Sequence, residues 1–179
     1  MIAFDLRVDI GAAAMKLSLN WLLIFIREVC LVVWLGGLIV VDFIETPIRF
    51  RTPEISKEQA TAIGSRLFAR FGWIQVLVGT VLLFDCVSIS IWAGHGRDWV
   101  PVILAGTMLF AALIQSAYVT PRMLKYMGLF DARSTGSEGQ HHQFRALHKF
   151  YVSADVSKLI VGFSLLLYLS RPGVSAPGY

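Results

Sequence analysis

Long apolar stretches alternate with shorter polar ones along this chain, and the alternation predicts four membrane-spanning helices. Each apolar stretch approaches or exceeds the roughly 20 residues that a helix needs to cross a bilayer. The sequence therefore predicts an all-α fold, an integral membrane bundle of four transmembrane helices. We divide the chain into an N-terminal segment (1–17), the transmembrane domain (18–170) and a C-terminal tail (171–179), with spans at about 19–43, 73–92, 99–119 and 150–169.

The polar connections between these spans differ in character. After the first span, residues 44–72 contain Pro47 and Pro53, and from Ser56 onward apolar residues recur at spacings of three and four. This pattern predicts an amphipathic interfacial helix that leads directly into the second span. Thr120-Pro121-Arg122 ends or kinks the third span, because proline removes a helical hydrogen bond. The N-terminal segment is mildly amphipathic and suits the membrane surface, a contact with a neighbouring protein, or a flexible tail.

The composition supports a membrane protein and excludes several other classes. Of the 179 residues, 56% are hydrophobic and 16% are charged, against roughly 25% charged in an ordinary soluble domain. No basic patch interleaved with aromatic residues suggests nucleic acid as a partner. Cys30 and Cys86 stand alone in apolar segments and are expected to be small buried side chains. The lipid bilayer is the first partner that the sequence implies.

The fourth span carries charges where a membrane helix tolerates them least. His148, Tyr151, Asp155, Lys158 and Gly162 recur at spacings of three and four, which places them on one stripe of a helix. A carboxylate and an ammonium in mid-membrane each cost about 3 kcal/mol in lipid. We therefore expect Asp155 and Lys158 to face the interior of the bundle.

Four further polar residues in the other spans are candidates for the same interior seam: Arg27, Glu28, Asp85 and Gln115. Counted from the cytoplasmic ends of their predicted spans, Asp85 lies about 18 Å deep and Lys158 about 13 Å deep. We expect Lys158 to pair with Asp85 or Glu28. Three acids against two bases leave one negative charge, which indicates a protonated carboxyl or a bound cation. The seam is either a proton path, ion site or ligand pocket, or a structural ion-pair network.

Histidine suggests a further hypothesis. His148, at the entrance of the fourth span, is a candidate axial ligand for a haem or another tetrapyrrole, and a surface or capping role is the alternative. His141 and His142 do not have the i, i+4 spacing of a helical metal site, so no metal site is predicted. No catalytic triad, phosphate-binding glycine loop or soluble catalytic domain is present in the pattern, and we expect a protein that is not an enzyme.

Basic residues predict the orientation of the chain. The connections 44–72 and 120–149 lie on one side of the membrane and hold ten of the 16 Lys and Arg residues, whereas the other side holds four. Lys and Arg accumulate in cytoplasmic loops. We therefore expect both termini on the non-cytoplasmic side of a membrane, and specifically of a bacterial inner membrane.

Several short motifs resemble one known family. They are Trp34-Leu35-Gly36-Gly37 followed by a Pro47 loop, Leu67-Phe68-x-Arg70-Phe71-Gly72-Trp73, Thr120-Pro121-Arg122, and Phe144-x-x-Leu147-His148. Their order resembles the transmembrane protein 205-like family, also called domain of unknown function 4149, over about residues 20–168. The resemblance implies a four-helix integral membrane protein. The chain is more distantly similar to the copper resistance protein D and HemJ-type group, although its first span contains no histidine.

These observations lead to three functional hypotheses. The first is an accessory or structural subunit of a larger membrane complex, with other membrane protein subunits as partners. The second is a haem-, tetrapyrrole- or copper-handling membrane protein that uses His148. The third is a small transporter or ion pathway along the charged seam, with Lys158 essential for transport.

Overall fold

A computed structural model describes residues 2–92, 98–125 and 138–171 of the chain. The described residues are almost entirely helical, and no strand occurs among them. The elements are α1 (Ile2–Leu38), the π-helix η1 (Ile39–Glu45), α2 (Thr46–Arg51), α3 (Lys57–Trp92), α4 (Val100–Ile114), the π-helix η2 (Gln115–Val119) and α6 (Glu138–Leu169). The predicted C-terminal tail lies outside the described residues, apart from Arg171.

Four helical stretches are long and apolar enough to cross a membrane: Ser18–Arg51, Gln59–Ile91, Val100–Lys125 and His142–Leu169. Only 28–39% of the most apolar window of each stretch is buried inside the protein. Large apolar side chains cover the outer surface, among them Phe84 at 72% exposure and Leu167 at 70%. A surface of this kind needs lipid to cover it. The predicted all-α bundle of four membrane-spanning helices is confirmed.

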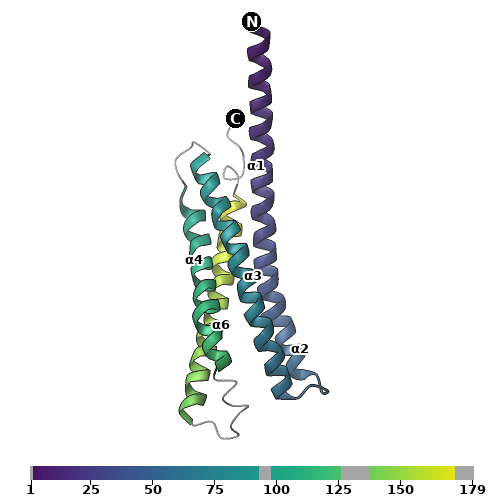
Figure 1. Cartoon of the computed structure of the whole chain (residues 1–179), viewed down its shortest axis with the longest axis vertical. Coiled ribbons are helices and arrows are strands. Elements are labelled where there is room, and N and C mark those ends of the chain that lie inside the picture. Colours follow the sequence, from purple (N-terminus) through teal and green to yellow (C-terminus); the bar gives the residue numbers. More distant parts are fainter. Residues whose placement is uncertain (1, 93–97, 126–137, 172–179) are drawn as a thin grey trace.

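The four stretches run alternately up and down, and α1 is longer than the bundle it joins (Figure 1). Its N-terminal part projects past the other helices, and no break separates residues 2–17 from the first span. At the opposite end lie α2, the start of α3 and the start of α6 (Figure 1). We call this the α2 end of the bundle.

The first and third spans extend further as helix than the pattern of polar residues predicts. Residues 44–51, expected in a loop, are helical, and the expected interfacial helix is the unbroken first part of α3. The third span continues as helix to Lys125. Neither Pro47 nor Pro121 ends its helix, so the helices continue past residues 44 and 120, where the connections were expected to start.

Two π-helices explain how the prolines are tolerated. The backbone N–H of Thr46, just before Pro47, donates to the carbonyl of Val41, and that of Thr120, just before Pro121, donates to the carbonyl of Gln115. These bonds reach back five residues instead of four. The Thr46 hydroxyl also donates to the Val41 carbonyl at 2.8 Å. Wide turns and threonine hydroxyls of this kind satisfy the backbone groups that a proline leaves unpaired in a membrane helix.

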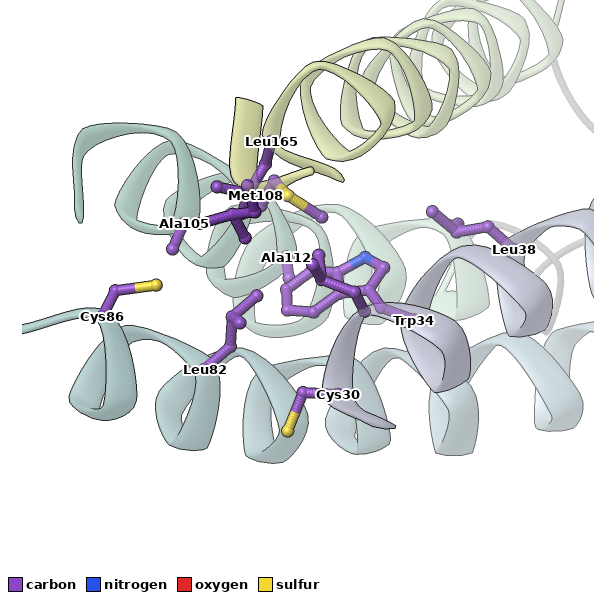
Figure 2. Packing of buried hydrophobic residues seen from close by; sticks show 11 residues of the cluster. Cys30, Trp34, Leu38, Leu82, Cys86, Ala105, Met108, Ala112 and Leu165 are labelled. Atoms are coloured by element: carbon purple, nitrogen blue, oxygen red, sulfur yellow. The ribbon is translucent and has the colours of Figure 1, made fainter. Parts of the chain in front are cut away.

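The apolar core lies in the middle of the bundle, where α1, α3, α4 and α6 meet. Figure 2 shows Trp34 of α1 beside the side chains of α3, α4 and α6 that pack in this core. Trp34 is only 1% exposed. Its ring lies over Gly79 of α3, where an added Cβ would fall 2.6 Å from Trp34 Cη2. A small residue opposite the large ring allows α1 and α3 to approach closely, as membrane helices require.

Candidate functional site

Buried polar side chains from three elements meet between the apolar core and the α2 end. Lys158 of α6 is 1% exposed, and its Nζ lies 2.7 Å from Asp155 Oδ1, one turn earlier on the same helix. Lys158 Nζ also donates to Gln75 Oε1 of α3 at 2.5 Å. Gln115 Nε2 donates to Asp155 Oδ1 at 3.1 Å and to the Tyr151 carbonyl at 3.0 Å. We call Gln75, Gln115, Asp155 and Lys158 the polar layer.

Asp42 of η1 joins this layer from the first span. Its carboxyl group lies close enough to that of Asp155 for the two to repel each other electrostatically. Asp42 was not among the residues predicted from the sequence, because it stands at the end of the predicted first span. A signal existed, since Asp42 follows the buried Trp34 and Leu38 on one helical stripe. Gln75 was also missed, because a neutral amide close to the end of a predicted span can reach water and does not need a partner inside the bundle.

A second buried pair lies further from the α2 end. Arg27 of α1 is 4% exposed and Asp85 of α3 is 2% exposed, and the two attract each other electrostatically. Among the described residues, no donor reaches either carboxylate oxygen of Asp85. Asp85 is ten residues beyond Gln75 on α3, a rise of about 15 Å. The pair is therefore a site of its own.

The six residues proposed as one seam thus divide into separate groups. Gln115, Asp155 and Lys158 come together in the polar layer, and Arg27 and Asp85 form the second pair. Glu28 is exposed on the outer face of α1. Lys158 pairs with Asp155 and Gln75 rather than with Asp85 or Glu28. The expected pairing of Lys158 with Asp85 or Glu28 was wrong. It relied on depths counted from the predicted ends of the spans, and α3 and α6 begin well before those ends.

A cavity of about 380 Å³ opens beside the polar layer at the α2 end. Its volume falls within the range of pockets that hold small organic molecules. Most of the surface of its wall is apolar, and its ionisable side chains are Asp42, Arg49, His148, Tyr151 and Asp155. The remaining lining residues are Phe43, Thr46, Phe50, Thr61, Gly64, Ser65, Phe68, Thr120, Met123, Leu124, Phe144, Val152 and Val156.

Arg49 forms one buried side of this cavity. It is 5% exposed, and its Nη1 donates to Glu45 Oε1 at 2.9 Å, one turn earlier. The guanidinium carbon lies 5.4 Å from the ring centre of Phe50 and 5.8 Å from that of Phe68. Gly64 of α3 leaves room for the guanidinium, since an added Cβ would fall 2.5 Å from Arg49 Cζ. The arginine charge is therefore neutralised and held in place.

The histidines and cysteines limit which cofactors this region can hold. His148 is exposed, lines the cavity, and stacks its ring parallel to Phe144 at a centroid distance of 6.3 Å. The structure does not describe the side chain of His141. Among the described residues, no group of three or more His, Cys, Asp and Glu side chains is arranged to hold a metal ion. Cys30 and Cys86 are free thiols buried in the apolar core.

The fold and this site define a polytopic α-helical membrane protein with a cavity next to a buried polar layer. The family described as "Domain of unknown function (DUF4149)" matches residues 29–129, more than half of the chain. The chain therefore belongs to the DUF4149 family. No curated protein and no solved structure matches the chain. The matched region includes Asp42, Gln75 and Gln115, whereas Asp155 and Lys158 lie beyond it.

Proposed function

We propose that this chain is a small transporter whose organic ligand binds in the cavity at the α2 end. The observation that carries the proposal is the cavity itself, which has an apolar wall and borders buried charges at membrane depth. Ionisable groups inside a membrane bundle usually mark a substrate or ion pathway. The Arg27–Asp85 pair supports the proposal further, because it continues the charged groups toward the other end of the bundle.

The test of ligand binding uses the purified chain in lipid nanodiscs and the neutral fluorophore N-phenylnaphthylamine, which brightens in apolar surroundings. We expect a saturable fluorescence increase above the signal of empty nanodiscs. Val152→Phe should remove it, because Val152 lines the cavity and a phenyl ring would fill the space. Val32→Phe is the matched control, since Val32 is 69% exposed on α1 and is not part of the cavity wall. Equal binding by both variants would contradict the proposal.

The transport step is tested in proteoliposomes with the compound that binds best in nanodiscs. Lys158→Met should abolish its protein-dependent uptake, because Lys158 is the cation of the polar layer beside the cavity. Binding of N-phenylnaphthylamine to the same variant shows whether the cavity is still formed. Uptake that continues at the original rate would argue against a transport pathway through this layer.

We place the α2 end on the cytoplasmic side of a bacterial inner membrane as part of this proposal. The support is the excess of basic residues in the sequence on that side. Native Cys30 and Cys86 are buried, so single exposed cysteines can report the orientation. A membrane-impermeant thiol reagent should label Ser170→Cys in intact cells, and Lys57→Cys only after the cells are permeabilised. The reverse pattern would invert the assignment.

A second candidate function is an accessory subunit of a membrane complex. Glu28 favours it, because this carboxylate is exposed on α1 among exposed apolar side chains such as Phe25, Val29 and Val32. A carboxylate facing lipid is costly unless a partner supplies a cation. The extension of α1 past the bundle offers further surface for a partner (Figure 1). Purification from native membranes should then recover a stoichiometric partner protein, and Glu28→Gln should release it.

Two resemblances suggested by the sequence motifs, to transmembrane protein 205 and to the copper resistance protein D and HemJ-type group, are also kept as proposals. Likeness to transmembrane protein 205 adds no activity, whereas likeness to the copper resistance protein D and HemJ-type group implies a haem or copper site at His148. The observation in its favour is that His148 lines the cavity. An absorption spectrum of the protein from native membranes tests it, because a haem band that disappears in His148→Ala would establish this assignment.

A further inference from the structure

Around the cavity, the acidic side chains outnumber the basic ones by one. Where the cavity meets the polar layer, the acids are Asp42, Glu45 and Asp155, and the bases are Arg49 and Lys158. Glu45 pairs with Arg49 at 2.9 Å and Asp155 pairs with Lys158 at 2.7 Å. Asp42 is the third acid and has no base of its own among these residues. Its Oδ2 is buried, and no donor from the described residues reaches it.

Asp42 and Asp155 both line the cavity, and only Asp155 has a cation paired with it. A carboxylate that is buried without a counter-ion and lies near a second acid is costly, so we expect the Asp42 carboxyl to hold a proton. The other groups around the two carboxyls are Lys158 and Tyr151 of α6, Gln75 of α3 and Gln115 of η2. Glu45, Arg49 and His148 complete the ionisable groups on the cavity side. The Asp42 carboxyl thus offers one exchangeable proton at the cavity wall.

From this arrangement we infer that the cavity takes a lipophilic ammonium ion, whose nitrogen replaces the proton of the Asp42 carboxyl beside Asp155. The inference rests on the proposed role of the cavity in ligand binding. The ammonium donates its hydrogen bonds to the carboxylates, and the displaced proton leaves to water. One positive charge enters and one leaves, so the charge of the site does not change. The apolar body of the ligand lies against rings such as Phe43, Phe68 and Phe144.

An anionic ligand fits the same cavity less well. Among the described residues, Arg49 is the arginine that lines the cavity, and its charge is already neutralised by Glu45. Its guanidinium is also held near the rings of Phe50 and Phe68. An anion would have to displace Glu45 from a buried ion pair, which is expensive. A cation needs only to displace a proton.

A matched series of ligands tests the inference: octylammonium, octanol and octanoate share one apolar body and differ in charge. Their binding to the chain in nanodiscs is measured by titration calorimetry, with empty nanodiscs subtracted. Two buffers of different ionisation enthalpy report the number of protons released. We expect octylammonium to bind most tightly and to release about one proton per ligand. Octanol should bind weakly and release none.

Variants then assign the effect to Asp42. Asp42→Asn should weaken octylammonium binding by about 10- to 100-fold, the range of a charge-assisted hydrogen bond, and should leave octanol binding unchanged. Unchanged octanol binding also shows that the variant is folded. Glu54→Gln, at an exposed acid outside the cavity wall, is the control and should change neither ligand.

The possible outcomes separate the two proposals. Octanol binding as tightly as octylammonium, octanoate binding most tightly, or octylammonium binding without proton release would each overturn the inference and leave a ligand-binding cavity. If none of the three compounds binds and N-phenylnaphthylamine binding is insensitive to Val152→Phe, the proposed function itself fails. Both proposals would be supported if the wild type releases a proton on binding octylammonium, and if Asp42→Asn, but not Glu54→Gln, loses the preference for octylammonium over octanol.

Discussion

Replacing Lys158 by methionine removes the only cation of the polar layer while keeping much of the apolar length of the side chain. Lys158 is 1% exposed and donates to Asp155 Oδ1 and to Gln75 Oε1. Without it, the Asp155 carboxylate keeps only the donor from Gln115 within this layer, and the Gln75 oxygen loses the donor that the structure gives it. The variant therefore leaves a charge buried without its counter-ion.

The expected cost follows from this geometry. Removing one partner of a buried ion pair destabilises a protein by about 3–5 kcal/mol, because the remaining charge stays buried. That is a large part of a typical stability of about 5–15 kcal/mol. Lys158→Met with Asp155→Asn should recover most of the loss, since the double variant has no unpaired charge. Lowering the pH should also reduce the cost in the single variant, because a protonated carboxyl is cheaper to bury than a carboxylate.

The two free cysteines provide the assay. Cys30 and Cys86 are 8% and 2% exposed in the apolar core, so a thiol-reactive dye labels them when the bundle opens. Labelling across a series of mixed micelles with increasing sodium dodecyl sulfate gives the unfolding midpoint. Lys149→Met, an exposed lysine on the same helix, is the control and should shift stability by no more than about 0.5 kcal/mol. A Lys158→Met midpoint equal to that of the wild type, or a double variant no better than the single one, would refute the reasoning.

Two further substitutions use the same assay. Gly64→Ala should cost about 1–3 kcal/mol, because the new methyl group would meet the Arg49 guanidinium, whose Cζ lies only 2.5 Å from the Cβ position. Its control is Gly106→Ala, where the nearest neighbouring atom is 3.9 Å from the Cβ position, and this variant should be neutral or slightly stabilising. Arg27→Met should cost about 1–3 kcal/mol, because it removes the buried cation that attracts the Asp85 carboxylate of α3 without a direct hydrogen bond, whereas Glu28→Gln next to it should stay within about 0.5 kcal/mol. Equal effects within either pair would contradict the burial argument.

Much of the fold follows from composition and periodicity alone, because lipid leaves so few alternatives. In hydrocarbon every backbone group needs an internal partner, so a long apolar stretch becomes a helix. The positions of the helix ends did not follow. Thr120-Pro121-Arg122 was expected to end or kink the third span, and Pro47 to lie in a polar connection. Both helices continue instead through a π-turn, in which the threonine before the proline donates to the carbonyl five residues earlier. The pattern of polar residues does not reveal this compensation.

The candidate site was predictable only in part, for a similar reason. A helical stripe is a property of one helix, and the stripe placed Asp155 and Lys158 on one face, which the structure buries inside the bundle. Their contact with each other was not predicted. Which residue of α3 lies opposite Lys158 depends on how far α3 is shifted along α6. That shift is set by how both helices pack on α1, with Gly79 of α3 against Trp34 and Gly162 of α6 against Leu35, and no single stretch of sequence expresses it. The contacts with Gln75 and Asp42 therefore appeared only in three dimensions.

The two π-turns connect the fold to the cavity. Each one inserts an extra residue into a helical turn and so rotates everything that follows around the helix axis. Thr46 and Thr120, which end these turns, both line the cavity, and so does Arg49 just beyond the first turn. Asp42 lies inside the first turn and Gln115 begins the second, so both π-turns also supply the polar groups around Asp155. Tolerance of proline and formation of the site are thus achieved by the same local geometry, because the wide turns that satisfy the backbone also direct side chains toward α6.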